Sequence, residues 1–427
     1  MSVKNISSAI LGVGVDDTTI DLFESQYPVP TGVSYNSYVI RDEKIAILDT
    51  VDDRATDEWL ANVTEALDGR KPEYLIVSHM EPDHGANIAK LAALYPEMQV
   101  VGNAKTFQYM EQFFGADAIA PERRVVVKDG ESLSLGAHTL TFVFAPMVHW
   151  PEVMVSYESS EKVLFSADGF GRFGAVAKFD ENADWASEAR RYYLNIVGKY
   201  GPQVQALLKK AAALDIKTIC PLHGPVWRKN IGWFVDKYSK WSSYTPEQEG
   251  SVLIAYSSVY GHTENAAQVL ATMLAERGVR NIAMYDVSVT HPSYVVAEAF
   301  RCSHLVFAST TYNAGIFCNM ETALLDIAAH NLQNRTIALI ENGSWAPTAG
   351  KLMRGILSKL KNVNILNETL TIKSSLKDDQ LGARRDRGRA RGLHAEARAD
   401  RQRGQAEPRR ALQVPVRPVR ALRPRRG

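Results

Sequence analysis

The chain has 427 residues, of which 45% are hydrophobic and 23% are charged, with a formal net charge of +1; this is ordinary for a globular protein of two or three domains. No apolar run reaches the roughly 18 residues that a membrane helix needs, and the N-terminus makes a poor signal peptide, so we expect a cytoplasmic protein with no membrane partner. The three cysteines, Cys220, Cys302 and Cys318, form no C-x-x-C pair, which argues against a disulfide framework, a rubredoxin-type iron site and a cysteine zinc site in this chain.

The first 245 residues or so mix short β-rich runs with helical patterns. Several of the candidate strands alternate apolar and polar residues, as half-buried strands do. They lie at residues 37–50, 73–79, 139–145, 154–159 and 162–168. This part of the chain therefore predicts a mixed α/β domain.

The first motif that carries chemistry is the segment 78–87, Ser-His-Met-Glu-Pro-Asp-His-Gly-Ala-Asn. It places His79, Glu81, Asp83 and His84 within six residues, on a loop between a strand and a helix, where a sheet can hold them rigidly. A single histidine there would be an ordinary surface or core residue. Crowded imidazoles and carboxylates repel or titrate badly unless cations hold them, so we predict a metal site.

Three further ligand-type residues each follow a β-rich run: His149, Asp168 and His223. Taken alone, Asp168 is equally well a helix or turn cap, and the two histidines are ordinary loop residues. Together with the first four they give seven ligands, which is enough for two metals that share one bridging carboxylate.

The order H-x-[EH]-x-D-H, followed by His, Asp and His, is the pattern of the metallo-β-lactamase superfamily. Its hydrolases usually have histidine at the second position and bind zinc, whereas Glu81 makes this site harder, more anionic and better suited to iron. The motif resembles that of the flavodiiron family (A-type flavoproteins), whose H-x-E-x-D-H signature it matches residue for residue. In some family members the residue that corresponds to His84 is not a direct ligand. The resemblance implies one iron on His79, Glu81 and His149, another on Asp83, His84 and His223, and Asp168 as the bridge.

Residues 241–250 are rich in Ser, Pro, Gln and Gly and are predicted to be a linker, after which the pattern changes. Apolar runs at 251–256, 304–310 and 335–344 alternate with helical patterns such as 264–278. Near-continuous apolar strands separated by helices predict a parallel sheet covered on both faces.

The segment 256–265 follows the first of these runs and opens a helix. Backbone N–H groups at a helix start, with hydroxyls and a glycine, form a phosphate cradle. The segment lacks the P-loop lysine and G-x-G-x-x-G, which argues against a nucleoside triphosphate and a dinucleotide. Many such turns are simple helix caps. This one resembles the flavodoxin phosphate loop, which implies FMN.

Two later loops, 309–317 and 341–353, also follow strands, and open parallel sheets bind ligands at the carboxyl ends of strands. Both resemble flavodiiron loops, although Tyr312 and Trp345 are alternatively core aromatics. The predicted FMN-binding residues are Ser258, Val259, Tyr260, Gly261, His262, Thr263, Thr311, Tyr312, Asn313, Gly315, Gly343, Ser344 and Trp345.

The resemblance covers roughly residues 5–380, with both sets of motifs in the family's order. It implies a metallo-β-lactamase-like αββα sandwich at 1–248, then a flavodoxin-like doubly wound parallel-sheet domain at 249–380. The implied activity is reduction of O2 to water, NO to N2O, or both, with no catalytic residue beyond the di-iron ligands. FMN would relay electrons from rubredoxin or an NAD(P)H-linked reductase, in a head-to-tail homodimer.

Two other functions stay open. The chain could be a zinc hydrolase of the metallo-β-lactamase type with a flavodoxin-like appendage; Glu81 argues against it, and metal analysis discriminates. It could also be an O2 or NO sensor, which slow or absent turnover with a competent donor would favour.

The last segment, 381–427, has 15 arginines, no lysine and 4 acids, a net charge of +11, which leaves 1 − 11 = −10 for the other 380 residues. It lacks any apolar periodicity, and the amphipathic helix expected at the end of a doubly wound domain is not visible. We interpret it as a disordered end or an out-of-frame product, because shifted reading of GC-rich codons yields arginine without lysine. A tail that binds nucleic acid or an acidic surface is the less favoured alternative, so no nucleic-acid partner is expected.

Overall fold

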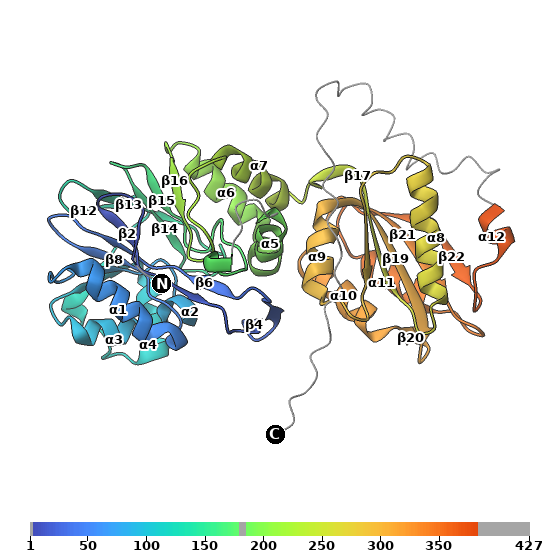
Figure 1. Cartoon of the computed structure of the whole chain (residues 1–427), viewed down its shortest axis with the longest axis horizontal. Coiled ribbons are helices and arrows are strands. Elements are labelled where there is room, and N and C mark those ends of the chain that lie inside the picture. The colour runs from blue at the N-terminus through green and yellow to red at the C-terminus, as the bar shows by residue number, and fades with distance from the viewer. Residues whose placement is uncertain (1–2, 179–184, 383–427) are drawn as a thin grey trace. The chain divides into compact units, whose positions relative to one another are not determined.

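The structure is a computed structural model that describes residues 3–178 and 185–382 (Figure 1). Contacts within the chain define two compact units, Met1–Leu376 and Lys377–Gly427, and the fold described below is that of the first. Nearly all of the predicted arginine-rich tail, 381–427, lies outside the described residues. None of the described helices combines the length and the apolar character that crossing a membrane requires.

The N-terminal part contains a seven-stranded sheet with the strand order β1-β2-β7-β8-β9-β10-β11. Side chains alternate between its faces: Val39 packs among the outer helices, whereas Tyr38 and Ile40 face a second sheet. The strands are β1 (Lys4–Asn5), β2 (Ile10–Gly12), β7 (Tyr38–Ile40), β8 (Ala46–Leu48), β9 (Tyr74–Ile76), β10 (Gln99–Gly102) and β11 (Arg124–Val126). The outer helices are α1 (Thr56–Leu67), α3 (Ile88–Leu94) and α4 (Ala104–Phe114).

The second sheet has five strands in the order β12-β13-β14-β15-β16. Phe142 and Met154 on its inner face join the core of the first sheet, and Val155 and Leu164 on its outer face pack among helices. The four layers of helix, sheet, sheet and helix confirm the predicted αββα sandwich (Figure 1). The strands are β12 (Ser132–Ser134), β13 (Thr139–Phe144), β14 (Met154–Glu158), β15 (Val163–Phe165) and β16 (Thr218–Cys220), and the helices are α5 (Trp185–Tyr192), α6 (Gly201–Ala211) and α7 (Ile231–Ser242).

Two details of this part differ from the sequence prediction. The run 37–50 is not one strand but an antiparallel pair, β7 and β8, because the polar residues 41–44 form the reversal between them. The predicted linker at 241–250 is shorter, since α7 ends at Ser242 and the next strand begins at Gln248. The domain boundary at residue 248 stays a prediction.

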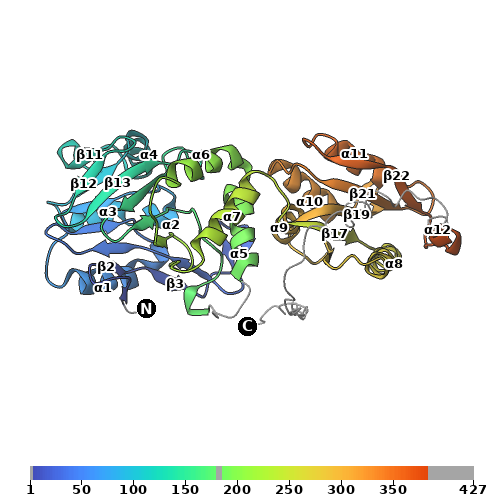
Figure 2. The same ribbon diagram turned by 90° about the horizontal axis from the view of Figure 1, so that it is seen from above.

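The third large sheet has the order β18-β17-β19-β21-β22, and all of these neighbours are parallel. This is the 2-1-3-4-5 order of flavodoxin-like folds, which confirms the predicted doubly wound sheet. Figure 2 shows α8 on the opposite face of the sheet from α9, α10 and α11. The strands are β17 (Gln248–Ser257), β18 (Ile282–Asp286), β19 (Cys302–Tyr312), β21 (Thr336–Asn342) and β22 (Asn364–Ile372), with the short β20 (Gly315–Ile316) beside β19. The helices are α8 (His262–Glu276), α9 (Pro292–Arg301), α10 (Cys318–Ala329) and α11 (Ala349–Leu357).

Candidate metal centre and flavin loops

The loop that carries four of the predicted ligands is held tightly by its backbone. It follows β9 and runs into the short helix α2 (Pro82–Gly85), whose first residue is the proline that stiffens the turn. The Asp49 carboxylate at the end of β8 accepts hydrogen bonds from the backbone N–H groups of Ser78, at 2.7 Å, and His79, at 3.3 Å. Because these contacts fix the backbone at Ser78 and His79, they also limit the orientation of the His79 side chain.

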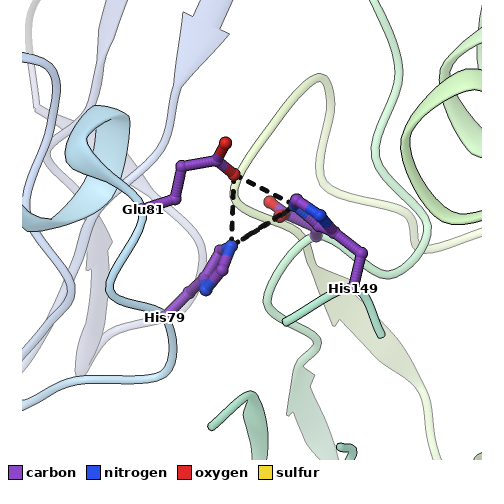
Figure 3. A group of neighbouring side chains, drawn as sticks. His79, Glu81 and His149 are labelled. Carbon is purple, nitrogen blue, oxygen red and sulfur yellow. Dashed lines mark hydrogen bonds and ion pairs between the residues drawn. The ribbon is translucent and has the colours of Figure 1, made fainter. Parts of the chain in front are cut away.

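The first group of candidate ligands consists of His79, Glu81, His149 and Asp168, whose ligand atoms all lie within 4.8 Å of one another. Figure 3 shows His79, Glu81 and His149 pointing toward a common point. Oε2 of Glu81 lies 3.2 Å from Nε2 of His79 and 3.0 Å from Nε2 of His149. These side chains come from the loop after β9, the loop before β14 and the end of β15, so three strand ends converge here.

The second group consists of Asp83, His84 and His223, and it meets the same distance limit. Nε2 of His84 lies 3.0 Å from Nε2 of His223, and Oδ2 of Asp83 lies 3.2 Å from Nε2 of His223. His84 and His223 are buried. The structure thus brings together all seven residues that the sequence predicted as ligands.

Asp168 lies between the two groups and gives one oxygen to each. Oδ2 is 3.0 Å from Nε2 of His149 and 3.4 Å from Nε2 of His79, whereas Oδ1 is 3.4 Å from Nε2 of His84 and 3.6 Å from Nε2 of His223. A carboxylate with this arrangement is suited to bridge two cations.

The outward nitrogens of two histidines have fixed partners. Nδ1 of His79 lies 2.7 Å from the carboxylate of Glu152, which is fully buried, and Nδ1 of His223 lies 2.9 Å from the carbonyl oxygen of Ser34. A hydrogen bond donated by Nδ1 leaves Nε2 as the free lone pair, so both rings are oriented to bind a metal through Nε2.

The cluster holds opposite charges in a buried space. Burial by itself would lower the pKa of His149, but hydrogen bonds with Asp168 and Glu81 outweigh it and raise the pKa to about 9. Burial likewise opposes ionisation of Asp168, yet His149 and His84 hold the pKa of its carboxyl well below the usual range. The shared carboxylate of Asp168 is therefore ionised at neutral pH, as cation binding requires.

A polar cleft of about 390 Å³ opens beside the two groups, lined by Glu24, Tyr35, Arg54, Glu81 and Asp83 among others. Glu24 lies in the turn between β4 (Leu22–Phe23) and β5 (Tyr27–Pro28). Burial, and then the charge of Glu81, raise the pKa of Glu24 to about 7. Because Glu81 of the first group and Asp83 of the second both line it, the cleft borders both groups of candidate ligands.

The first predicted flavin loop joins β17 to α8. Gly261 has φ +82°, a left-handed conformation that glycine adopts without strain, and it caps the N-terminus of α8. Oγ of Ser258 is buried and makes no hydrogen bond, which fits a donor awaiting a phosphate oxygen. Oγ1 of Thr263 lies 3.0 Å from Oγ1 of Thr310 and accepts a hydrogen bond from Asn342, so this loop is tied to the ends of β19 and β21.

The other two flavin loops are tied to each other. Asn313 (φ +48°) and Ala314 (φ +57°) form the tight turn between β19 and β20. Oγ1 of Thr311 accepts hydrogen bonds from the backbone N–H groups of Thr348, at 3.0 Å, and Ala349, at 3.2 Å. The side chains of the predicted FMN residues that follow these strands therefore share one edge of the sheet, at the end where ligands of parallel sheets bind.

The two aromatic residues of these loops are not core residues. Trp345 is 91% exposed and Tyr312 is 49% exposed. Tyr260 of the first loop is 89% exposed. This excludes the alternative that Tyr312 and Trp345 pack in the core, and it leaves their rings free to contact a flat ligand.

Comparisons with known proteins agree with this architecture. Residues 33–224 match the model of the family described as ODP family beta lactamase. The chain is 31% identical over 350 residues to the rubredoxin-oxygen oxidoreductase of Megalodesulfovibrio gigas, which covers 80% of this chain and 85% of that one. It is 29% identical over 363 residues to the nitric oxide reductase of Moorella thermoacetica, covering 83% and 90% of the two chains.

Solved structures give the same result. The rubredoxin oxygen:oxidoreductase of Desulfovibrio gigas matches with a TM-score of 0.84 and 27% identity, over 93% of this chain and 100% of that one. The flavodiiron protein of Giardia intestinalis matches in fold with a TM-score of 0.85 and 23% identity, over 94% and 98% of the two chains. The chain belongs to the flavodiiron family. As a flavodiiron protein it is an oxidoreductase; the names of its relatives indicate a flavin, its family implies a di-iron centre, and the structure has two groups of residues that could hold metal ions.

The donor set of this flavodiiron protein fits two irons. The carboxylate oxygens of Asp83 and Asp168 are buried, and their close contacts are to ring nitrogens of the candidate ligand histidines. Buried carboxylates are costly unless positive charge compensates them, and a bound metal ion would supply that charge. Four imidazoles and three carboxylates form the harder kind of ligand set that suits iron.

Sequence reasoning missed two residues of this site, Asp49 and Glu152. Asp49 directly follows the apolar residues 45–48, in the way that Asp168 follows its own β-rich run, which is a signal that could have marked it. Glu152 lies three residues after His149 in an otherwise apolar segment and is fully buried. An isolated acid in such a segment indicates a buried polar contact, but it does not say with which residue.

Proposed function

We propose that this flavodiiron protein reduces O2 to water, NO to N2O, or both, at two irons, and that FMN relays the electrons. The observation that carries the proposal is the position of Asp168, with one oxygen toward each group of candidate ligands. Glu81 adds a carboxylate where a zinc hydrolase of the same superfamily has histidine.

The proposed ligands are His79, Glu81 and His149 for one iron, and Asp83, His84 and His223 for the other, with Asp168 shared. We propose His84 as a direct ligand because its Nε2 faces the other two residues of the second group, His223 and Asp83. When bound, two irons and a flavin can together supply the four electrons that O2 needs to become water. The protein's own part is to fix the rings through Glu152 and Ser34, and to admit protons through the cleft at Glu24.

FMN is the proposed flavin, since the first loop offers a phosphate cradle without a dinucleotide motif. The residues proposed to bind it are Ser258, Val259, Tyr260, Gly261, His262 and Thr263 of the first loop, Thr311, Tyr312, Asn313 and Gly315 of the second, and Gly343, Ser344 and Trp345 of the third. The backbone and hydroxyl groups of the first loop would hold the phosphate, and Tyr312 and Trp345 would flank the ring.

The proposed electron donor is a rubredoxin or an NAD(P)H-linked reductase. A rubredoxin-type donor is supported by the names of the M. gigas relative and of the anaerobic nitric oxide reductase flavorubredoxin of Shigella flexneri. We also propose a head-to-tail homodimer, which the exposed flavin loops would permit, and which light scattering would test as a mass of twice 47.3 kDa.

Metal and flavin content of the purified protein test the proposal. About two irons and one FMN per chain, with O2 or NO consumption from a reduced rubredoxin, is the expected result. Zinc without flavin after anaerobic, iron-replete expression would instead indicate the hydrolase, and a loaded protein without turnover would indicate a sensor.

A further inference from the structure

A second cavity lies behind the metal centre, between the second sheet and the helices that cover it. Its volume is about 20 Å³, and it is largely enclosed. Its floor is formed by Val155 of β14 and Leu164 of β15, and its roof by Val204 and Leu208 of α6 and Tyr238 of α7.

This cavity shares its wall with the metal centre at two places. Val148 lines the cavity and precedes His149, and Gly169 lines it and follows Asp168. The candidate ligands His149 and Asp168 are therefore each adjacent in sequence to a residue that lines the cavity. One of them is the residue that both metal groups share.

The lining of the cavity is apolar, so the cavity disfavours water and favours an apolar molecule. The cavity offers almost no polar surface. The two polar side chains on it are already engaged: Oγ of Ser166 donates to the carbonyl of Gly169 at 2.6 Å, and the hydroxyl of Tyr238 accepts from the N–H of Phe170. A buried water needs two to four polar partners, and apolar cavities without them stay dry yet bind xenon.

The volume of the cavity limits the size of the molecule that it can hold. A cavity measured in this way needs roughly 10 to 15 Å³ to hold one water-sized molecule, so about 20 Å³ suits one molecule of two heavy atoms. The cleft on the other side differs in both respects, because it is larger and is lined by Glu24, Asp52, Arg54 and other charged residues. The polar cleft suits ions and protons, whereas the apolar cavity suits a small uncharged molecule.

We propose that the apolar cavity at Val148, Gly169 and Val204 is a holding site for one molecule of a diatomic gas, O2 or NO, next to the metal centre. This inference rests on the proposed function for the identity of the gas. The site raises the local concentration of the gas and supplies it to the centre without passage through the charged cleft.

Xenon is the probe for the site itself. Crystals of the full-length, metal-loaded protein pressurised with xenon should show one xenon atom between α6 and β15. Val204→Phe should remove it by filling the space, and Leu208→Ala should retain it. Ala206→Phe, on the exposed side of the same helix, is the matched control and should leave xenon in place. No xenon in the unsubstituted protein would overturn the proposal and leave the cavity a packing defect.

Kinetics then test the role. In Val204→Phe the KM for gas should rise about fivefold or more while kcat at saturating gas, iron content and FMN content stay unchanged. Because a large residue at Val204 could impair folding, Val155→Leu fills the same space more conservatively and should raise KM in the same direction. An unchanged KM in a folded variant that has lost xenon would also overturn the proposal. A loaded protein that binds xenon but consumes neither gas would refute the proposed function instead, so the two failures are distinguishable.

Discussion

The metal centre and the flavin loops bind their proposed cofactors in opposite ways. The metal residues are almost completely enclosed, and the outward nitrogens of His79 and His223 are held by Glu152 and Ser34. The flavin loops lie at an open sheet edge, with Tyr260 and Trp345 about nine-tenths exposed. The first site depends on buried charge that metal cations would compensate. The second depends on a helix N-terminus and hydroxyl groups, among them the unpaired Oγ of Ser258, that would donate hydrogen bonds to a phosphate.

The difference teaches which changes each site tolerates. Removing a buried charge leaves its partners uncompensated, so single substitutions at the metal centre should have large and coupled effects. A loop tied by several modest hydrogen bonds should lose affinity in small steps.

The largest effect is expected for Asp168→Ala. Loss of the shared carboxylate should remove both irons and lower gas consumption by more than about 100-fold, while FMN content stays unchanged. Elemental analysis measures the iron content, and the absorbance of released flavin measures the FMN content. Asp215→Ala, at an exposed carboxylate that pairs with Lys217 at 3.1 Å, is the control and should retain both cofactors. Retention of two irons by Asp168→Ala would contradict the bridging role.

Glu152→Gln should weaken iron binding by about 10- to 100-fold, because the amide orients His79 less well and lowers its basicity. Iron titration into chelator-treated protein measures this affinity. Glu158→Gln is the matched control: Glu158 is equally buried, and its carboxylate accepts from the N–H groups of Ser160 and Glu161 rather than from a ligand. Equal losses in both variants would mean a general loss of stability.

The pH dependence should separate the two sites. The raised pKa of His149 means that its imidazolium stabilises the metal-free fold below about pH 6.5, and that this contribution is lost as pH rises through about 9. Iron must displace that proton, so its affinity should rise by about tenfold per pH unit between about pH 7 and 9. FMN affinity over the same range should change little. Parallel titrations at several pH values measure both, and a flat iron curve would contradict the charged cluster.

The smallest effect is expected for Thr263→Val, which removes the hydroxyl that joins the first flavin loop to Thr310 and Asn342. The two lost hydrogen bonds, at about 0.5 kcal/mol each, should together weaken FMN binding by roughly fivefold and leave iron content unchanged. Fluorescence titration of the flavin-free protein measures it. Thr272→Val, at an exposed position of the same helix, should have no effect. An effect as large as that of Asp168→Ala would erase the contrast between the sites.

The sequence predicted the fold class well because both parts of the chain have strong patterns. The apolar runs at 251–256, 304–310 and 335–344 became the central parallel strands β17, β19 and β21. The sequence could not predict that residues 37–50 form a hairpin, since an apolar–polar–apolar run fits one strand or two.

The site shows the same limit. Seven possible ligands were visible because their residue types are costly in such a crowd unless a metal binds them. Glu152 could not be predicted, because the role of a single buried acid depends on a partner that only the fold supplies, whereas Asp49 had a signal at the end of its β-rich run that the prediction did not use. The cavity behind Val148 has no sequence signal at all, since valine and leucine look the same whether they pack fully or leave a gap.

The shared position of Asp168 also constrains how the family can diversify. A change at this residue alters both metal positions at once, so the two cannot be adjusted independently through it. Glu81 contacts only the first group, and Asp83 only the second. Substitutions at Glu81 or Asp83 should therefore alter one metal position at a time, whereas a substitution at Asp168 should alter both.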